Sequence, residues 1–114
     1  MSTLAEIGIE RHGGTVVARL AGEVDMTNAA RVREQLLDAV PNDALALVVD
    51  LGDCRYLDSA AIEVIFDLSR RLQRRRQELR LVLPDSSPLG RVLVLTDVNS
   101  VAPVHSSLEA ALAQ

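Results

Sequence analysis

The sequence predicts an α/β fold, in which a mixed and mostly parallel sheet of four or five strands is flanked by about four helices. Two observations predict this class. Two strand-like segments lie on either side of a Gly-Gly pair near the start, the pattern of a β-hairpin. After residue 27, segments with helical spacing alternate with short apolar runs, which is typical of strands joined by helices. The length of 114 residues suits a single domain, residues 1–114, with one packed core.

The elements of the first half follow from local patterns. Partial alternation of apolar and polar residues predicts a strand, apolar residues on one helical stripe predict a helix, and an unbroken apolar run predicts a strand buried on both faces. Thr27 is a suitable helix N-cap, and Pro41 stops a helix. These signals give strands over residues 4–10 and 15–20, a helix over 27–40 and a strand over 44–50.

The second half continues the alternation. A loop over residues 52–58 leads into the longest helical pattern, whose apolar residues from Ile62 to Leu72 share one inward stripe. Ser87 followed by Pro88 is the pattern of an N-cap and a first helical residue. The remaining expected elements are a strand over 79–83, a short helix over 87–95, an extended piece over 101–104 and a last helix over 106–113.

Composition and charge argue against several kinds of function. The net charge of −4 and an aromatic content of 2% argue against binding of nucleic acid through its phosphates or its bases. One cysteine permits no internal disulfide, the acidic residues lack metal-loop spacing, and no glycine-rich phosphate loop is present, so we expect no metal and no cofactor. The longest apolar run, residues 44–49, is far shorter than the ~20 residues of a spanning helix. Since the first residues also lack a signal-peptide pattern, we expect a cytoplasmic protein that does not insert into membranes.

The most informative segment is the loop that delivers Asp58 and Ser59 to the start of the long helix. The backbone N–H groups of a first helical turn are unpaired and carry the positive end of the helix dipole. A Ser hydroxyl there can cap the helix, and a phosphate on that Ser would be well tolerated. Local physics therefore leaves two interpretations of Ser59 open, a simple cap and a switch.

The strongest family signal is Asp-Leu-Gly-Asp-Cys-Arg-Tyr-Leu-Asp-Ser-Ala-Ala-Ile over residues 50–62. Together with three further segments, it resembles the STAS domain family, in particular its bacterial anti-sigma factor antagonists. Leu-Ala-Gly-Glu-Val-Asp over residues 20–25 is similar to the family's element before its first helix. The segments over residues 88–93 and 104–112 are similar to its third and closing helices. The resemblance covers nearly the whole chain in order, and it implies the STAS-like α/β fold.

The resemblance also implies site residues. The family's phosphoacceptor falls on Ser59, its preceding acid on Asp58, and the acid of the upstream loop on Asp25, which the fold is expected to place beside that Ser. The working surface is expected over residues 22–27 and 56–63. The partner-binding residues implied are Asp25, Thr27, Asp58, Ser59, Ala60, Ala61 and Glu63.

By the same resemblance, the protein is not an enzyme. The implied function is antagonism of an anti-sigma factor that is also a serine kinase of the histidine-kinase-like ATPase fold. The form that is unmodified at Ser59 would bind this kinase and release a sigma factor, and a serine phosphatase would reverse the modification. The family commonly has Ser and then Gly after the acceptor, where this chain has Ala60 and Ala61, a departure that bears on recognition by the kinase.

All twelve basic residues are arginine, which we interpret as the codon bias of a GC-rich bacterium.

Two rival functions remain. One is a STAS subunit of a lipid-transport or stress-signalling assembly, in which Ser59 acts only as a cap and contact. The other is a small hydrolase or nucleotide-binding protein, although His12 and His105 lie far from Ser59 in the sequence and no nucleophile elbow is present. We interpret the arginine-rich segment over residues 70–76 as a solvated helix end, not as a surface for nucleic acid or membrane, and Cys54 as an ordinary loop residue.

Overall fold

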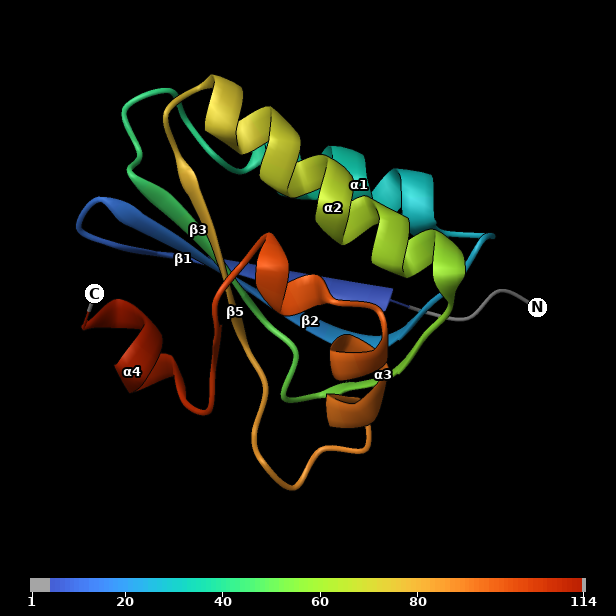
Figure 1. Cartoon of the computed structure of the whole chain (residues 1–114). Helices are drawn as coiled ribbons and strands as arrows, with labels where there is room; N and C mark the ends of the chain where they lie inside the picture. The colour runs from blue at the N-terminus through green and yellow to red at the C-terminus, as the bar shows by residue number, and fades with distance from the viewer. Residues whose placement is uncertain (1–4, 114) are drawn as a thin grey trace.

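A computed structural model describes residues 5–113 and has the predicted α/β class (Figure 1). Strands and helices alternate after an initial hairpin. In chain order the elements are β1 (Ala5–His12), β2 (Thr15–Val24), α1 (Ala29–Asp38), β3 (Ala46–Asp50), β4 (Cys54–Leu57), α2 (Ser59–Arg74), β5 (Glu78–Val82), α3 (Gly90–Leu95), a 3-10 turn η1 (Val98–Ser100), β6 (Val104–His105) and α4 (Leu108–Leu112). Within this described range, no helix has the length and apolar character needed to cross a membrane. The strand expected from Leu4 begins at Ala5, since Leu4 lies outside the described residues.

The sheet is mixed and mostly parallel, as the sequence predicts. The strand order is β1-β2-β3-β5-β6, and β4 pairs with the end of β2 beyond β3. β1 and β2 run antiparallel, whereas the other pairs are parallel. The two-residue turn between β1 and β2 places His12 opposite Thr15. Gly13 in this turn adopts a φ of 61°, which glycine reaches without strain.

The described part of the chain has six strands, more than the expected four or five. The additional pairing comes from β2, whose ten residues are long enough to pair first with β3 and then with β4. β4 occupies a segment that was expected to be a loop. Cys54 and Leu57 are buried while the two residues between them are exposed, so the segment lacks the alternation of buried and exposed residues by which a strand is predicted. β6 is only two residues long and lies in the segment expected to be extended.

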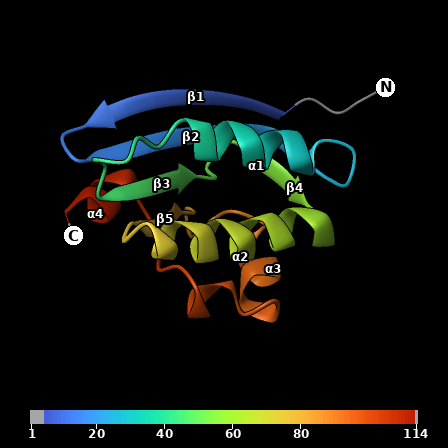
Figure 2. The same ribbon diagram turned by 90° about the horizontal axis from the view of Figure 1, so that it is seen from above.

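The helices cover the two faces of the sheet unequally. α1 and α2 lie side by side over one face, and α4 covers part of the other (Figures 1 and 2). The main core between the sheet and α1 and α2 is aliphatic, as the near absence of aromatic residues requires. Leu36, Leu47 and Leu68 are 1% exposed or less, and burial of each such side chain contributes about 1.5–3 kcal/mol. A smaller cluster under α4 includes Val48 and Ala111.

Three helix starts differ from the sequence-based expectation. α1 begins at Ala29 after Asn28, not with Thr27 as its cap, because the Thr27 side chain hydrogen-bonds to Asp25 instead. α3 begins at Gly90, since Ser87 caps a turn by accepting from the N–H of Leu89. α4 is confined to Leu108–Leu112, where Ser107 accepts from the N–H of Ala110.

Candidate functional site

Asp58, not Ser59, caps α2. The Asp58 backbone is extended, with φ −95° and ψ −172°, and its Oδ1 accepts from the N–H of Ala61 at 3.0 Å. This geometry satisfies one of the unpaired donors of the first turn. Ser59 is then the first helical residue, so the sequence-based interpretation of Ser59 as a simple cap is wrong. The long helix needs no Ser at this position to begin.

The same carboxylate also joins α2 to the loop that follows β2. Asp58 Oδ2 accepts from the backbone N–H of Met26 at 3.0 Å, and the Asp58 N–H donates to the carbonyl of Val24 at 3.2 Å. Residues 22–28 and 56–63, which we call the junction, are thereby held together although they lie far apart in the sequence. The two segments that the family resemblance implies are therefore neighbours in the structure.

Asp25 sits at the centre of the upstream loop. Its Oδ1 accepts from the Thr27 hydroxyl at 2.6 Å and from the Thr27 N–H at 2.9 Å. These two hydrogen bonds, the hydroxyl first, hold the pKa of the Asp25 carboxyl below its usual value. The Asp25 carbonyl accepts from the N–H groups of Asn28 and Ala29, which starts α1. Thr27 therefore holds the Asp25 carboxylate in a fixed position.

The remaining junction residues differ in exposure. Ser59 and Glu63 are exposed, and no hydrogen bond ties the Ser59 hydroxyl to another residue of the described range. Ala60 is half-buried, whereas Ala61 is 2% exposed and belongs to the main core. A side chain so buried cannot contact a partner directly, so the Ala61 side chain acts in packing and its backbone in the cap.

Met26 was missed by reasoning from the sequence. Its side chain is 79% exposed, although it is apolar and its backbone is fixed by Asp58. The available signal was a large apolar residue between polar ones, in Val-Asp-Met-Thr-Asn over residues 24–28. Met26 thus adds an exposed apolar side chain to the junction, next to Asp25 in the sequence.

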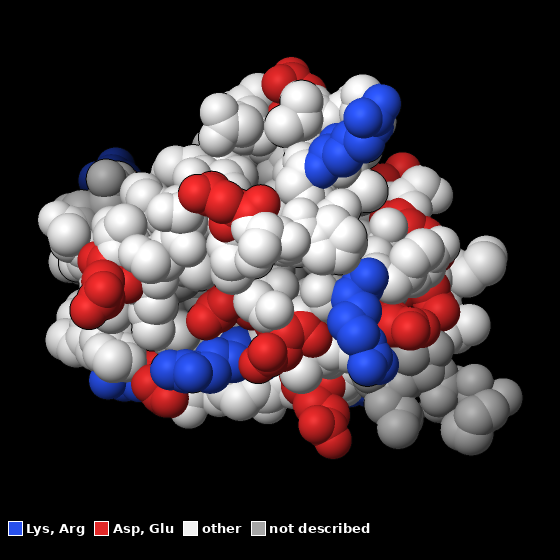
Figure 3. Space-filling model, turned by 90° about the horizontal axis from the view of Figure 1, so that it is seen from below, with Lys and Arg blue, Asp and Glu red and all other residues white. Residues whose placement is uncertain are grey.

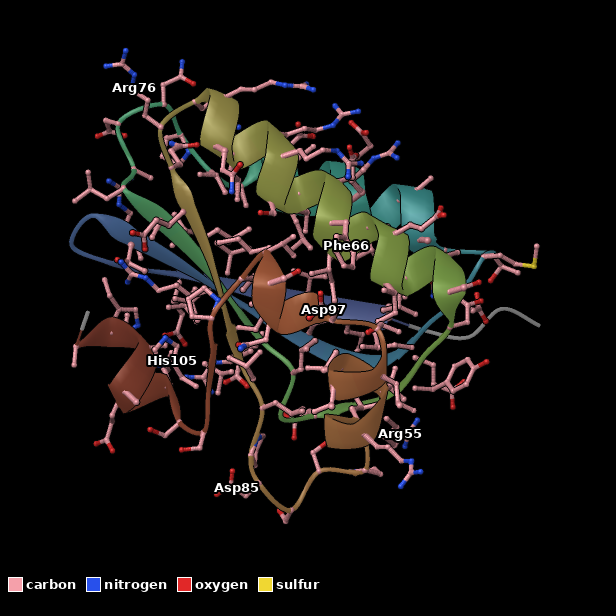
Figure 4. The ribbon with its side chains drawn as sticks, in the orientation of Figure 1. Arg55, Phe66, Arg76, Asp85, Asp97 and His105 are labelled. Atoms are coloured by element: carbon pink, nitrogen blue, oxygen red, sulfur yellow. The ribbon has the colours of Figure 1, made fainter. Side chains whose placement is uncertain are left out.

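The structure does not gather catalytic or metal-binding groups at the junction. His105, beside α4, and the turn that follows His12 lie at the opposite side of the molecule from the start of α2 (Figures 1, 2 and 4). Over residues 5–113, no three His, Cys, Asp or Glu side chains are arranged to hold a metal ion. Cys54 is buried, and burial raises the pKa of its thiol, which disfavours the reactive thiolate.

Charge is distributed without a broad basic surface on the face shown in Figure 3. Acidic and basic side chains lie interspersed there. The arginines at the end of α2 are partly engaged, since Arg71 pairs with Asp67 at 3.0 Å and Arg75 donates to the carbonyl of Val40 at 2.6 Å. These contacts agree with a solvated helix end better than with a surface for nucleic acid.

Comparison with known proteins gives one family. The family model described as "STAS domain" matches residues 6–111. The chain is 26% identical over 114 residues to RsfA of Mycobacterium tuberculosis, which is named an anti-sigma-F factor antagonist, and the match covers 98% of this chain and 88% of RsfA.

Solved structures give the same fold. The structure of an anti-sigma factor antagonist from Mycobacterium paratuberculosis is 24% identical in sequence, with a TM-score of 0.84 over 96% of this chain and 92% of that one. The Bacillus cell fate determinant SpoIIAA in its phosphorylated form is 21% identical, with a TM-score of 0.63 over 95% of this chain and 97% of that one. At these identities the likeness shows a shared fold.

Proposed function

Since the chain belongs to the STAS domain family, we propose that it is an anti-sigma factor antagonist that acts by binding and not by catalysis. Its partner would be an anti-sigma factor that is also a serine kinase of the histidine-kinase-like ATPase fold, and binding would release a sigma factor in the bacterial cytoplasm. RsfA, which matches along nearly the whole chain, carries this kind of name. A serine phosphatase would restore the binding form.

The observation that carries the proposal is the exposed Ser59 at the first turn of α2, beside a capping carboxylate. Its hydroxyl is accessible to a kinase, and the fold does not need that hydroxyl because Asp58 supplies the cap. SpoIIAA, which shares the fold, has been solved in a phosphorylated form. A residue that is exposed, positioned and dispensable for folding suits a modification site.

Phosphorylation would change the charge of the junction strongly. The Ser59 oxygen would take the γ-phosphoryl group of ATP, its proton would pass to a base of the kinase, and ADP would leave. The phosphate adds about −1.5 to −2 charge. Asp25 and Asp58 already make the junction acidic, and Glu63 lies one turn along the same helix face. A partner that matches three carboxylates would then meet an excess of negative charge, which costs affinity.

The experiment is an intact-mass measurement after incubation with ATP and the candidate anti-sigma kinases of the same genome. Ser59→Ala is the control, and it should fold because Ala is favourable in a helix and the cap is retained. One added phosphate that is absent in the control supports the switch.

A stable complex without phosphate would instead favour a non-switching STAS subunit of a lipid-transport or stress-signalling assembly. Failure to bind any candidate kinase would contradict the proposed function.

A further inference from the structure

An open groove runs between α1 and α2, starting at the junction. Met26 and Ala60 line it at the end near Ser59, and Arg70 and Arg71 line it at the other end. Its volume is roughly 620 Å³. From Ser59 to Arg71 the helix rises about 18 Å, at ~1.5 Å per residue. The groove is thus long enough for three turns of a second helix.

The far end of the groove holds a cluster of three arginines around one carboxylate. Asp67 contacts Arg71 at 3.0 Å, Arg70 at 3.4 Å and Arg33, from α1, at 3.9 Å. Arg33 also contacts Glu34 at 3.2 Å. Three guanidinium groups carry about fifteen N–H donors, more than two carboxylates can accept. This end therefore has donors and positive charge left for an additional anionic group.

The two ends of the groove are opposite in charge. The end near Ser59 is acidic through Asp58 and Glu63, and the far end is basic through its arginines. Between them the groove is lined by small or apolar side chains, which include Ala30 and the half-buried Phe66 (Figure 4). An amphipathic helix with basic residues at one end and acidic residues at the other would match this pattern.

We propose that a helix of the partner kinase docks along the groove between α1 and α2 and places acidic side chains on Arg33, Arg70 and Arg71. This inference rests on the proposed function, and it extends the contact surface away from Ser59. Specific interfaces bury about 800 Å² per partner, so a partner that reads Ser59 is expected to cover neighbouring surface as well. The groove begins at Ala60, directly after Ser59, and its charged ends could match opposite charges on a partner helix. It is therefore the surface next to Ser59 over which we expect the interface to extend.

The occupant is a protein helix and not nucleic acid. The net charge of −4 opposes a polyanion at long range, and the acidic end of the groove would repel it at short range. An acidic helix end presents only a few carboxylates, which match the few arginines at this position.

The test compares two charge reversals at the same end of α2. Arg70→Glu with Arg71→Glu changes residues that line the groove, whereas Arg74→Glu with Arg76→Glu makes the same charge change outside it. Arg76 lies just beyond the C-terminal end of α2 (Figure 4). Each variant is titrated against the recombinant kinase by calorimetry at low and at physiological salt, and circular dichroism checks that each is folded.

We expect the groove reversal to weaken binding on the order of tenfold or more and to remove much of its salt dependence, because like charges then face the partner. The control reversal should stay within about twofold. Equal losses in both variants, or no loss in either, would overturn the groove as the docking site.

Two further outcomes are decisive. A groove reversal that weakens binding of duplex DNA but not of the kinase would overturn the inference in favour of nucleic acid. If the unmodified wild-type chain binds no candidate kinase, the proposed function fails and this inference with it. Kinase binding that is sensitive to Ser59→Asp but unaffected by the groove reversal overturns the inference alone.

Discussion

The backbone N–H of Met26 donates to Asp58 Oδ2 at 3.0 Å, across 32 positions of sequence. The other oxygen of this carboxylate caps α2 through Ala61. One side chain therefore both starts the helix that carries Ser59 and fixes the loop that carries Asp25. A change at either segment can reach the other through Asp58.

The two roles of Asp58 can be separated by substitution. Asp58→Ala removes both hydrogen bonds and should lower the free energy of unfolding by about 2 kcal/mol, from ~1 kcal/mol for the cap and ~1 kcal/mol for the bond to Met26. Asp58→Asn keeps one acceptor oxygen for the cap and should cost about half as much. Urea unfolding measures both. Asp85→Ala, at an exposed turn, is the matched control and should change stability by less than ~0.5 kcal/mol. Equal losses for the Ala and Asn variants would show that the cap contributes nothing, whereas an Asn variant as stable as the wild type would show that the bond to Met26 contributes nothing.

Acid should reduce stability partly through Asp25. Its pKa in the folded state is lowered, chiefly by the Thr27 hydroxyl. Above the ordinary carboxyl pKa of about 3.8, the folded and unfolded states are both ionised and the full contribution is present. As the pH falls below that value the unfolded state takes up the proton first, so the contribution is lost on the way to the lower folded pKa.

Thr27→Val should therefore bring the pKa of Asp25 back toward its ordinary value, whereas Thr27→Ser should keep it low. Titration of the Asp25 carboxyl carbon by NMR reads this directly. The acid dependence of the unfolding midpoint should be shallower in Thr27→Val. An unchanged Asp25 pKa in the Val variant would contradict the hydrogen bond as its cause.

Much of this fold could be predicted because each signal was local. The Gly-Gly turn and the unbroken apolar run before Asp50 predicted the hairpin and the buried strand correctly. The strand Cys54–Leu57 could not be predicted, because its pairing depends on the length of β2, which is set by tertiary contact. The identity of the α2 cap was similarly open, since the adjacent residues Asp58 and Ser59 are both good capping residues. Which of them is the cap depends on where the backbone changes from extended to helical, and this change comes after Asp58.

The groove between α1 and α2 was also beyond the sequence. Helical spacing indicated the inward stripe of each helix, but not the angle at which two helices would pack or which side chains would line the space between them. The contact between Arg33 and Asp67 joins two helices and has no signature in either one alone.

Substitution at Ser59 should affect binding without affecting the fold. Ser59→Asp places negative charge at a helix N-terminus, which stabilises by ~0.3–1 kcal/mol, while it should weaken kinase binding because it imitates part of the phosphate charge. Ser59→Ala should bind the kinase and accept no phosphate. Ser86→Asp, at an exposed serine outside the junction, is the control and should bind normally. Kinase affinity is measured alongside the thermal midpoint, and Ser59→Asp that binds as tightly as wild type would contradict the switch.

The alanines after Ser59 should act on stability more than on recognition. Ala61 is 2% exposed in the first turn of α2, so Ala61→Gly, the common family residue, should lower the free energy of unfolding by about 1 kcal/mol through backbone entropy and lost packing. Ala60→Ser changes a half-buried position at the mouth of the groove and should be nearly neutral. If the kinase recognises the position of Ser59 and not the following residues, neither change alters the phosphorylation rate once the protein is folded. The double variant Ala60→Ser with Ala61→Gly tests the opposite case. A phosphorylation rate that rises severalfold in it would show that Ala60 and Ala61 slow the phosphorylation of Ser59 in this chain.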